Sequence, residues 1–343
     1  MKTIGITGSL GKTSVCEILY QYLLYKNKKV ALYSTNGVFK NGETVFKNFF
    51  ATSYNKVTME NELARLEDKN YDYAIIEVKG ELFLNSEDYV HMDIMALTNF
   101  YRGLVNNYNG SPSLLRLCKQ RALNCSDVRI ISANNTEEFP NYTDIWSLYD
   151  YSSLNPVTLT VDNETVVTDL FGKDHVSNLS LAIYILKKIN EYDGIWVFNN
   201  LNIRGRYAKY TVGGKDVIVD TGWSGFKHIM IRLKEVYGDN FKFNLIYVPI
   251  VENRETWTTK QYKSRSKDAL SLASRIIANT NLEKEMIIET YLDEEYPPEK
   301  VETYTDMNVC FQRAYETLEE GAILYIMARE KFREYKRIVE ELS

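Results

Sequence analysis

The chain opens with MKTIGITGSLGKTSV (residues 1–15), which places two glycines between two different apolar patterns. KTIGIT (2–7) has the apolar content of a buried strand, and TSVCEILYQYLLYK (13–26) repeats apolar residues at helical spacing. Gly8 and Gly11 lie between these segments and let the backbone turn tightly or approach a ligand closely. The stretch therefore predicts a strand, a glycine loop and a helix in direct succession.

This loop has the chemistry of a phosphate-binding site. Backbone N–H groups and a helix N-terminus would face the anion, a lysine would reach the terminal phosphates, and a hydroxyl would bind Mg²⁺. Ile6 stands where the general GxxxxGK[ST] pattern has its first glycine, so a glycine turn without a ligand is the alternative. The strand before and the helix after favour phosphate binding by Gly8, Ser9, Leu10, Gly11, Lys12, Thr13 and Ser14.

Strand-like and helical segments go on alternating after the loop, as in a parallel sheet covered by helices. The strand-like segments are KKVALYST (28–35), YAIIEV (73–78), DIMALTNF (93–100) and VRIISA (128–133). The helical ones are VTMENELARLEDK (57–69), SLLRLCKQRAL (113–123) and HVSNLSLAIYILKKI (175–189). An irregular stretch at 157–170 has the pattern of antiparallel strands. The sequence thus predicts an α/β fold.

The periodicity breaks in NNLNIRGRYAKYTVGGKD (199–216), which places a domain boundary near residue 203. We therefore expect one domain over residues 1–203 and another over 204–343. A second α/β series follows, consisting of residues 216–221, 226–237, 243–250, 268–280, 285–291, 309–321 and 322–328. The closing REKFREYKRIVEELS (329–343) is charged on most faces and is expected to be a solvated helix.

Composition favours a small-molecule enzyme. The chain has 343 residues, 45% of them hydrophobic, with 41 Lys and Arg against 46 Asp and Glu, which gives no support for nucleic-acid or membrane-surface binding. Four cysteines without a CxxC pair indicate a reducing compartment, and no segment resembles a signal peptide or membrane span, so a cytoplasmic protein is expected. The three histidines lack metal-ligand spacing, which argues against a zinc hydrolase.

With the loop written as GITGSLGKTS (5–14), the chain resembles the Mur ligase family, ATP-dependent enzymes that join an amino acid to a carboxylate. It is most similar to the UDP-MurNAc-tripeptide synthetase branch. YDYAIIEVKGEL (71–82) is similar to the family strand that ends in a Mg²⁺-binding glutamate, which implies Glu77. ALTNF (96–100) matches the family's TN at the next strand end. The resemblance implies a P-loop central ATPase domain followed by a Rossmann-like C-terminal domain.

Later matches in the same order imply further site residues. SPSLLRLCKQRAL (111–123) resembles the helix whose lysine is carbamylated in many members, which implies Lys119. By the same resemblance, Asn178 would meet the adenine, while Arg206 of RGRY and Asp220 of VIVDT would take nucleotide roles. From the residues alone, other roles stay open: an ion pair with Lys79 for Glu77, snorkelling for Lys119, a helix cap for Asn178, and a junction ion pair for Arg206.

The chain also departs from the family pattern. The family's first domain, which binds a nucleotide sugar, does not precede the loop, so we expect another substrate or a separate protein that supplies substrate binding. The family's Asp-His and later His after TN are replaced near Gly103, Leu104 and Tyr108, which puts a second metal site in doubt. The DYAH and GKGHE elements lack their histidines, so acceptor recognition is expected to differ.

The resemblance and the loop together predict an ATP-dependent ligase that forms an amide bond between a carboxylate and an amino acid or amine through an acyl phosphate. Its cofactors would be ATP and Mg²⁺, with Lys12, Glu77 and Lys119 catalytic and Thr13 and Glu77 binding the metal. The alternatives are a catalytically degenerate ATP-binding partner subunit of another enzyme, and a P-loop NTPase or kinase unrelated to ligases.

Overall fold

The structure is a computed structural model of the full chain. It describes residues 1–46, 52–101, 105, 108–132, 139, 149–168, 170, 172–194, 198–199, 201, 203, 208–221, 226–249, 270, 272–292, 295–328 and 331–343. The chain divides into two compact units. The first comprises Met1–Asp169 and Lys173–Arg204, and the second comprises Leu170–Gly172 and Gly205–Ser343.

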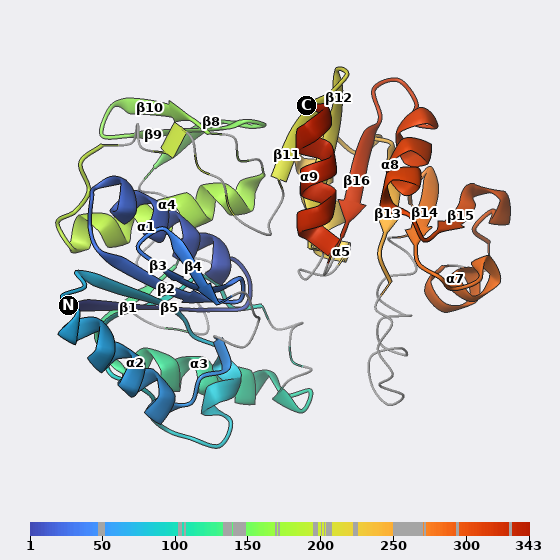
Figure 1. Ribbon diagram of the computed structural model, residues 1–343. Helices are drawn as coiled ribbons and strands as arrows, with labels where there is room; N and C mark the ends of the chain where they lie inside the picture. The colour runs from blue at the N-terminus through green and yellow to red at the C-terminus, as the bar shows by residue number, and fades with distance from the viewer. Residues whose placement is uncertain are drawn as a thin grey trace. The chain divides into compact units, whose positions relative to one another are not determined.

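The first unit is built on a seven-stranded sheet in the order β4-β3-β2-β5-β1-β6-β7 (Figure 1). Five strands, from β2 to β7 in this order, run parallel, and β3 and β4 extend the sheet antiparallel. The strands are β1 (Lys2–Thr7), β2 (Val30–Ser34), β3 (Gly37–Lys40), β4 (Glu43–Phe46), β5 (Tyr73–Glu77), β6 (Met92–Leu97) and β7 (Ser126–Ile131). Because β1 lies between β5 and β6, the loop that follows it leaves the sheet beside the ends of these two strands.

Helices cover both faces of this sheet, with α1 and α4 on one side and α2 and α3 on the other (Figure 1). Their bounds are α1 (Lys12–Tyr25), α2 (Lys56–Asp68), α3 (Pro112–Asn124) and α4 (Lys173–Lys188), with a 3₁₀ turn, η2, at Gly80–Phe83. Local signals set two of the starts. Asn55 and Ser111 each accept a backbone N–H bond as side-chain N-caps of α2 and α3, and Pro112 occupies the first turn of α3.

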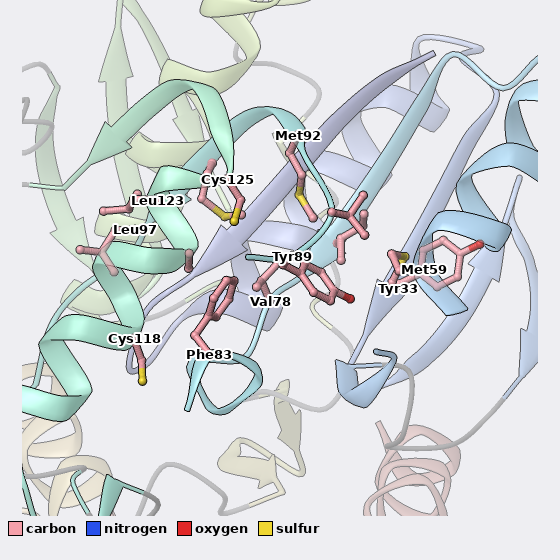
Figure 2. Packing of buried hydrophobic residues seen from close by; sticks show 14 of the residues in the cluster. Tyr33, Met59, Val78, Phe83, Tyr89, Met92, Leu97, Cys118, Leu123 and Cys125 are labelled. Atoms are coloured by element: carbon pink, nitrogen blue, oxygen red, sulfur yellow. The ribbon is translucent and has the colours of Figure 1, made fainter. Parts of the chain in front are cut away.

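The hydrophobic core beneath α2 and α3 contains residues from several strands and helices of the first unit. Figure 2 shows Tyr33 of β2, Met59 of α2, Phe83 of η2 and Leu97 of β6 in one cluster with the buried thiols of α3 and its end. All four cysteines of the chain are free and buried. This packing fixes η2 and α3 against the end of β5, where two of the expected site residues lie.

A small antiparallel sheet completes the first unit, as the pattern at 157–170 predicts. It consists of β8 (Asp150–Leu154), β9 (Val157–Val161) and β10 (Glu164–Val167), in the order β10-β9-β8. The helix pattern at 175–189 is confirmed as α4. The β3–β4 extension is an element that the sequence reasoning missed.

The second unit has a six-stranded sheet in the order β11-β12-β16-β13-β14-β15, parallel except for β11. The strands are β11 (Ala208–Val212), β12 (Lys215–Asp220), β13 (Phe243–Tyr247), β14 (Arg275–Asn279), β15 (Val301–Tyr304) and β16 (Ile323–Met327). The helices are α5 (Phe226–Tyr237), α7 (Lys284–Tyr291), α8 (Met307–Glu316) and α9 (Phe332–Leu342), with a 3₁₀ turn, η7, at Pro298–Lys300. This Rossmann-like arrangement confirms the predicted α/β class.

Alternate residues of these strands point to opposite faces, as strand geometry requires. Leu245 and Tyr325 join a cluster with α5 and α7, whereas Ile246 and Leu324 join a cluster with α8 and α9. Both faces of the sheet are therefore covered by helices.

The expectation of a solvated C-terminal helix is wrong. α9 buries Phe332, Tyr335, Ile338 and Val339 in the cluster with α8. Phe332, Tyr335 and the adjacent pair Ile338 and Val339 follow one another at intervals of three to four residues, so they form one apolar stripe between charged positions. No helix among the described residues is long and apolar enough to cross a bilayer.

Candidate functional site

The loop between β1 and α1 depends on both of its glycines. Gly8 has φ 141° and Gly11 has φ 81°, values that residues with a side chain rarely adopt. A Cβ at Gly8 would lie 2.0 Å from Thr98 Oγ1. Gly11 is the N-cap of α1, and no described side chain caps this helix end. The first N–H groups of α1 therefore remain available to an anion, as the loop motif predicts.

Two residues that follow β6 hold the loop in this shape. Asn99 Oδ1 accepts the Leu10 N–H at 2.9 Å, and Asn99 Nδ2 donates to the Leu10 carbonyl at 3.0 Å. Thr98 Oγ1 also donates to the Leu10 carbonyl, at 2.5 Å. Ser9 N–H donates to the Asn99 carbonyl at 2.9 Å. The TN pair therefore contacts the loop directly and fixes its backbone.

Two lysines meet at the carbonyl oxygen of Gly8. Lys12 Nζ donates to this oxygen at 3.0 Å and to the Ser9 carbonyl at 3.3 Å. Lys119 Nζ of α3 donates to the same Gly8 oxygen at 3.0 Å and to Thr7 Oγ1 at 3.4 Å. No ion pair of Lys12 with a carboxylate is present among the described residues. Its charge is therefore available to a phosphate.

Burial changes the protonation of Lys119. The Lys119 side chain is fully buried, which excludes snorkelling, and this desolvation together with the charge of Lys12 lowers its pKa to about 7. Carboxylates at Glu81 and Glu77 oppose part of this effect by raising the pKa. Near neutral pH, a substantial fraction of the amine is therefore uncharged.

Glu77 and Thr13 form a pair of oxygen groups beside the loop. Glu77 ends β5 and is buried, and Thr13 Oγ1 on the first turn of α1 donates to Glu77 Oε2 at 3.1 Å. Thr35 donates to the same carboxylate through its N–H and its hydroxyl, each at 2.8 Å. The Glu77 carboxylate thus accepts hydrogen bonds from two threonines and does not pair with Lys79. The alternative of a structural ion pair between Glu77 and Lys79 is therefore wrong. A hydroxyl and a carboxylate are hard oxygen ligands that fit Mg²⁺.

Asn178 reaches the loop from a distant part of the chain. It is buried on α4, and a Cβ at Gly11 would lie 2.3 Å from its Oδ1. Because α4 begins at Lys173, Asn178 lies inside the helix and is not its cap. The structure thus brings the predicted adenine-contacting residue against the predicted phosphate loop.

Tyr108 lies near the place where the resemblance implies a histidine of the family. Its hydroxyl donates to Glu81 Oε2 at 3.2 Å. Tyr108 and Lys119 converge on Gly80, where an added Cβ would lie 2.4 Å from the hydroxyl and 2.8 Å from the amine. Gly103 and Leu104 lie outside the described residues. Among the described residues, no group of three or more His, Cys, Asp or Glu forms a metal cluster.

The remaining predicted residues belong to the second unit or its border. Asp220 is buried at the carboxyl end of β12, and its Oδ2 accepts a hydrogen bond from Tyr325 Oη at 2.8 Å. In open α/β sheets this edge is where ligands bind. Arg206 lies outside the described residues. Lys331, in the segment where the resemblance implies the family's GKGHE element, donates to Asn279 Oδ1 at 2.7 Å.

Residues 6–103, which carry the loop, Glu77 and the TN pair, match the family model of the Mur ligase middle domain. The resemblance to the Mur ligase family is therefore confirmed over residues 6–103, whereas the later matches and the branch within the family stay predictions. No curated protein sequence matches the chain.

Solved structures show the same fold over nearly the whole chain. MurF ligase from Thermotoga maritima, in complex with ADP, matches with a TM-score of 0.66 and 13% identity, covering 100% of this chain and 81% of its own. A folylpolyglutamate synthase from Thermotoga maritima matches with a TM-score of 0.62 and 14% identity, over 99% and 89%.

A pseudomurein peptide ligase type C from Methanothermus fervidus matches with a TM-score of 0.64 and 13% identity, over 100% of this chain and 79% of its own. At these identities the comparisons show the fold alone. The two units therefore have the fold of these two ligases and of the folylpolyglutamate synthase.

Proposed function

We propose that this protein is an ATP-dependent ligase that forms an amide bond between a carboxylate and an amino acid or another amine. The observation that carries the proposal is the joint position of Lys12, Thr13 and Glu77 at the uncapped start of α1, within a Mur ligase middle domain. These groups are a cation, a hydroxyl and a carboxylate, which is the set that phosphoryl transfer from a magnesium nucleotide requires.

In this proposal, the backbone of Gly8, Ser9, Leu10 and Gly11 and the first turn of α1 bind the ATP phosphates. That turn includes Ser14. Lys12 moves from the Gly8 and Ser9 carbonyls to the terminal phosphates and neutralises charge there. Thr13 and Glu77 hold Mg²⁺, which supplies further positive charge as the γ-phosphoryl group transfers.

The reaction divides into two steps. A carboxylate oxygen of the first substrate attacks the γ-phosphorus, which releases ADP and leaves an acyl phosphate. The amine then attacks the acyl carbon, the C–O bond to phosphate breaks, and the amine loses a proton. The products are an amide, ADP and inorganic phosphate, with no further reactant.

Lys119 has a role of its own in the proposal. Its amine lies at the Gly8 carbonyl, beside the expected position of the terminal phosphates, and its pKa is lowered to about 7. An uncharged amine can react with CO₂, so carbamylation, as the resemblance implies, stays a prediction. Incorporation of isotopically labelled bicarbonate into wild type but not into Lys119→Arg would test it.

The nucleotide contacts of Asn178, Arg206 and Asp220 are proposals of the same kind. Asn178 is supported by its position against Gly11, and Asp220 by its place at the carboxyl end of β12. We also propose that residues 1–203 bind ATP and that residues 204–343 form the C-terminal domain that brings the amine.

One observation favours the alternative of a degenerate ATP-binding partner subunit. The Tyr108 hydroxyl donates to Glu81, and the resemblance implies a family histidine near Tyr108, so the second metal site of the family would lack that ligand. Such a subunit would bind ATP without turnover and would leave the chemistry, or the substrate-binding site, to another protein.

The experiment is ADP release by the purified protein with Mg-ATP across a panel of carboxylates and amines. The ligase proposal predicts release that depends on both substrates and is lost in Lys12→Ala. Lys56→Ala is the matched control, because Lys56 is exposed and pairs with Asp88 on the surface. Full turnover by Lys12→Ala would overturn the proposal, whereas ATP binding without substrate-dependent turnover would favour the partner subunit.

A further inference from the structure

The sheet topology brings Thr35 to the proposed metal-binding pair. Thr35 follows β2 directly and begins the short turn into β3. β2 and β5 are parallel neighbours, with Tyr33 opposite Ile76, so the chain beyond β2 passes the residue that ends β5. That residue is Glu77. Nothing in the loop motif marks Thr35, which is 42 positions away from Glu77 along the chain.

Thr35 contacts both oxygens of the Glu77 carboxylate. Its N–H donates to Oε2 at 2.8 Å, and its hydroxyl donates to Oε1 at 2.8 Å. Thr13 Oγ1 donates to Oε2 at 3.1 Å. A carboxylate with donors on both oxygens loses a hydrogen bond if it rotates, so Thr35 fixes its plane. The third bond then joins this fixed carboxylate to the hydroxyl on α1.

The turn that carries Thr35 is itself held in place. Asn36 N–H donates to Ser34 Oγ at 3.2 Å, and Asn36 Nδ2 donates to Glu17 Oε1 at 3.3 Å. Glu17 is fully buried on α1, four residues after Thr13, so both side chains lie on one face of that helix. One helix therefore positions both the turn and the Thr13 hydroxyl.

We propose that Thr35 is a positioning residue for the metal-binding pair Thr13–Glu77. Its two donors hold the carboxylate where it accepts the hydrogen of the Thr13 hydroxyl, which leaves the oxygen lone pairs of Thr13 for Mg²⁺. The inference rests on the proposed function, since it concerns the metal of the same site. Groups that orient a metal ligand typically change metal affinity by roughly 10–100-fold when removed.

The test distinguishes the effect of losing the Thr35 hydroxyl from the effect of changing the shape of its side chain. Thr35→Val removes the hydroxyl and keeps the backbone N–H, Thr35→Ser restores the hydroxyl, and Thr35→Ala is a second variant without it. Thr160→Val is the matched control, because among the described residues the Thr160 hydroxyl hydrogen-bonds with Thr165 alone, across the small antiparallel sheet. Each protein is titrated with ADP by calorimetry at a series of Mg²⁺ concentrations and in EDTA.

We expect Thr35→Val and Thr35→Ala to require about 10-fold more Mg²⁺ for half-maximal ADP binding. Binding in EDTA should be unchanged, and Thr35→Ser and Thr160→Val should match wild type. An unchanged Mg²⁺ requirement in both hydroxyl-free variants, or an equal loss of binding in EDTA, would overturn this inference alone. Wild-type protein that binds no ADP with Mg²⁺ would overturn the proposed function as well.

Discussion

The substitution Gly11→Ala tests whether Asn178 of α4 contacts the loop. Gly11→Ala would place a Cβ 2.3 Å from Asn178 Oδ1, so one of the two must shift. It would also put alanine at φ 81°. A matched control exists in Gly42, which has φ 89° and no atom within 4 Å of an added Cβ. The two substitutions therefore share the backbone strain and differ in the contact.

The expected losses of unfolding free energy follow from the backbone strain and the steric contact. Left-handed backbone costs alanine about 1–2 kcal/mol, which both variants lose. Forcing an extra methyl group into packed surroundings costs about 1–3 kcal/mol more, and only Gly11→Ala incurs it. We therefore expect the free energy of unfolding to fall by about 2–5 kcal/mol in Gly11→Ala and by about 1–2 kcal/mol in Gly42→Ala.

The assay is equilibrium unfolding in urea of wild type, both alanine variants, Asn178→Ala and the double variant Gly11→Ala/Asn178→Ala. Removing the Asn178 amide makes room for the methyl group, so the double variant should recover about 1–3 kcal/mol relative to the sum of the single changes. Additivity within about 0.5 kcal/mol, or equal losses in Gly11→Ala and Gly42→Ala, would refute the contact between α4 and the loop.

Two further predictions concern buried residues elsewhere. Lys119→Met should remove a pH dependence of stability. The folded pKa of Lys119 is about 7, so above that pH the unfolded chain binds more protons than the folded one, and the free energy of unfolding of wild type should rise relative to that of the variant between about pH 7 and 10. Parallel pH profiles of urea unfolding would contradict this. Val339→Ala should lower the free energy of unfolding by about 2 kcal/mol because Val339 is fully buried on the inner face of α9. Arg337→Ala, at an exposed position of the same helix, should change it by less than about 0.5 kcal/mol. Equal effects in thermal unfolding would contradict the packing of α9.

Local signals predicted the centre of the site well. The strand β1, the glycine loop and α1 are contiguous, so hydrophobic period and glycine position were enough to place them. The TN pair was expected at a strand end, and it lies there, at the end of β6. The parallel strands alternate with helices strongly enough to predict the class of both units.

Contacts that depend on strand order could not be predicted from the sequence. Thr35 reaches Glu77 only because β2 lies beside β5, and nothing in the letters of either strand specifies this order. Gly11 and Asn178 meet because α4 packs against α1 from more than 160 positions away. Both pairings follow from tertiary packing, which a local pattern does not contain.

In the C-terminal helix, the spacing of a few apolar residues matters more than the charged composition. α9 has only four buried residues among many charges, yet these four form a single stripe, and the stripe decides its packing. Residues 268–280 contain strand β14 and residues 285–291 lie within helix α7, so the predicted α/β alternation holds there. The short strand β15, VETY, alternates polar and apolar residues too briefly to be predicted.

The central claim is that a carboxylate oxygen attacks the γ-phosphorus of ATP at the Lys12 loop. The most direct measurement uses a carboxylate substrate labelled with heavy oxygen, followed by mass spectrometry of the inorganic phosphate that is released. An acyl phosphate transfers one carboxylate oxygen to this phosphate, so the account predicts labelled phosphate from wild type and none from Lys12→Ala. Amide formation with unlabelled phosphate would contradict it.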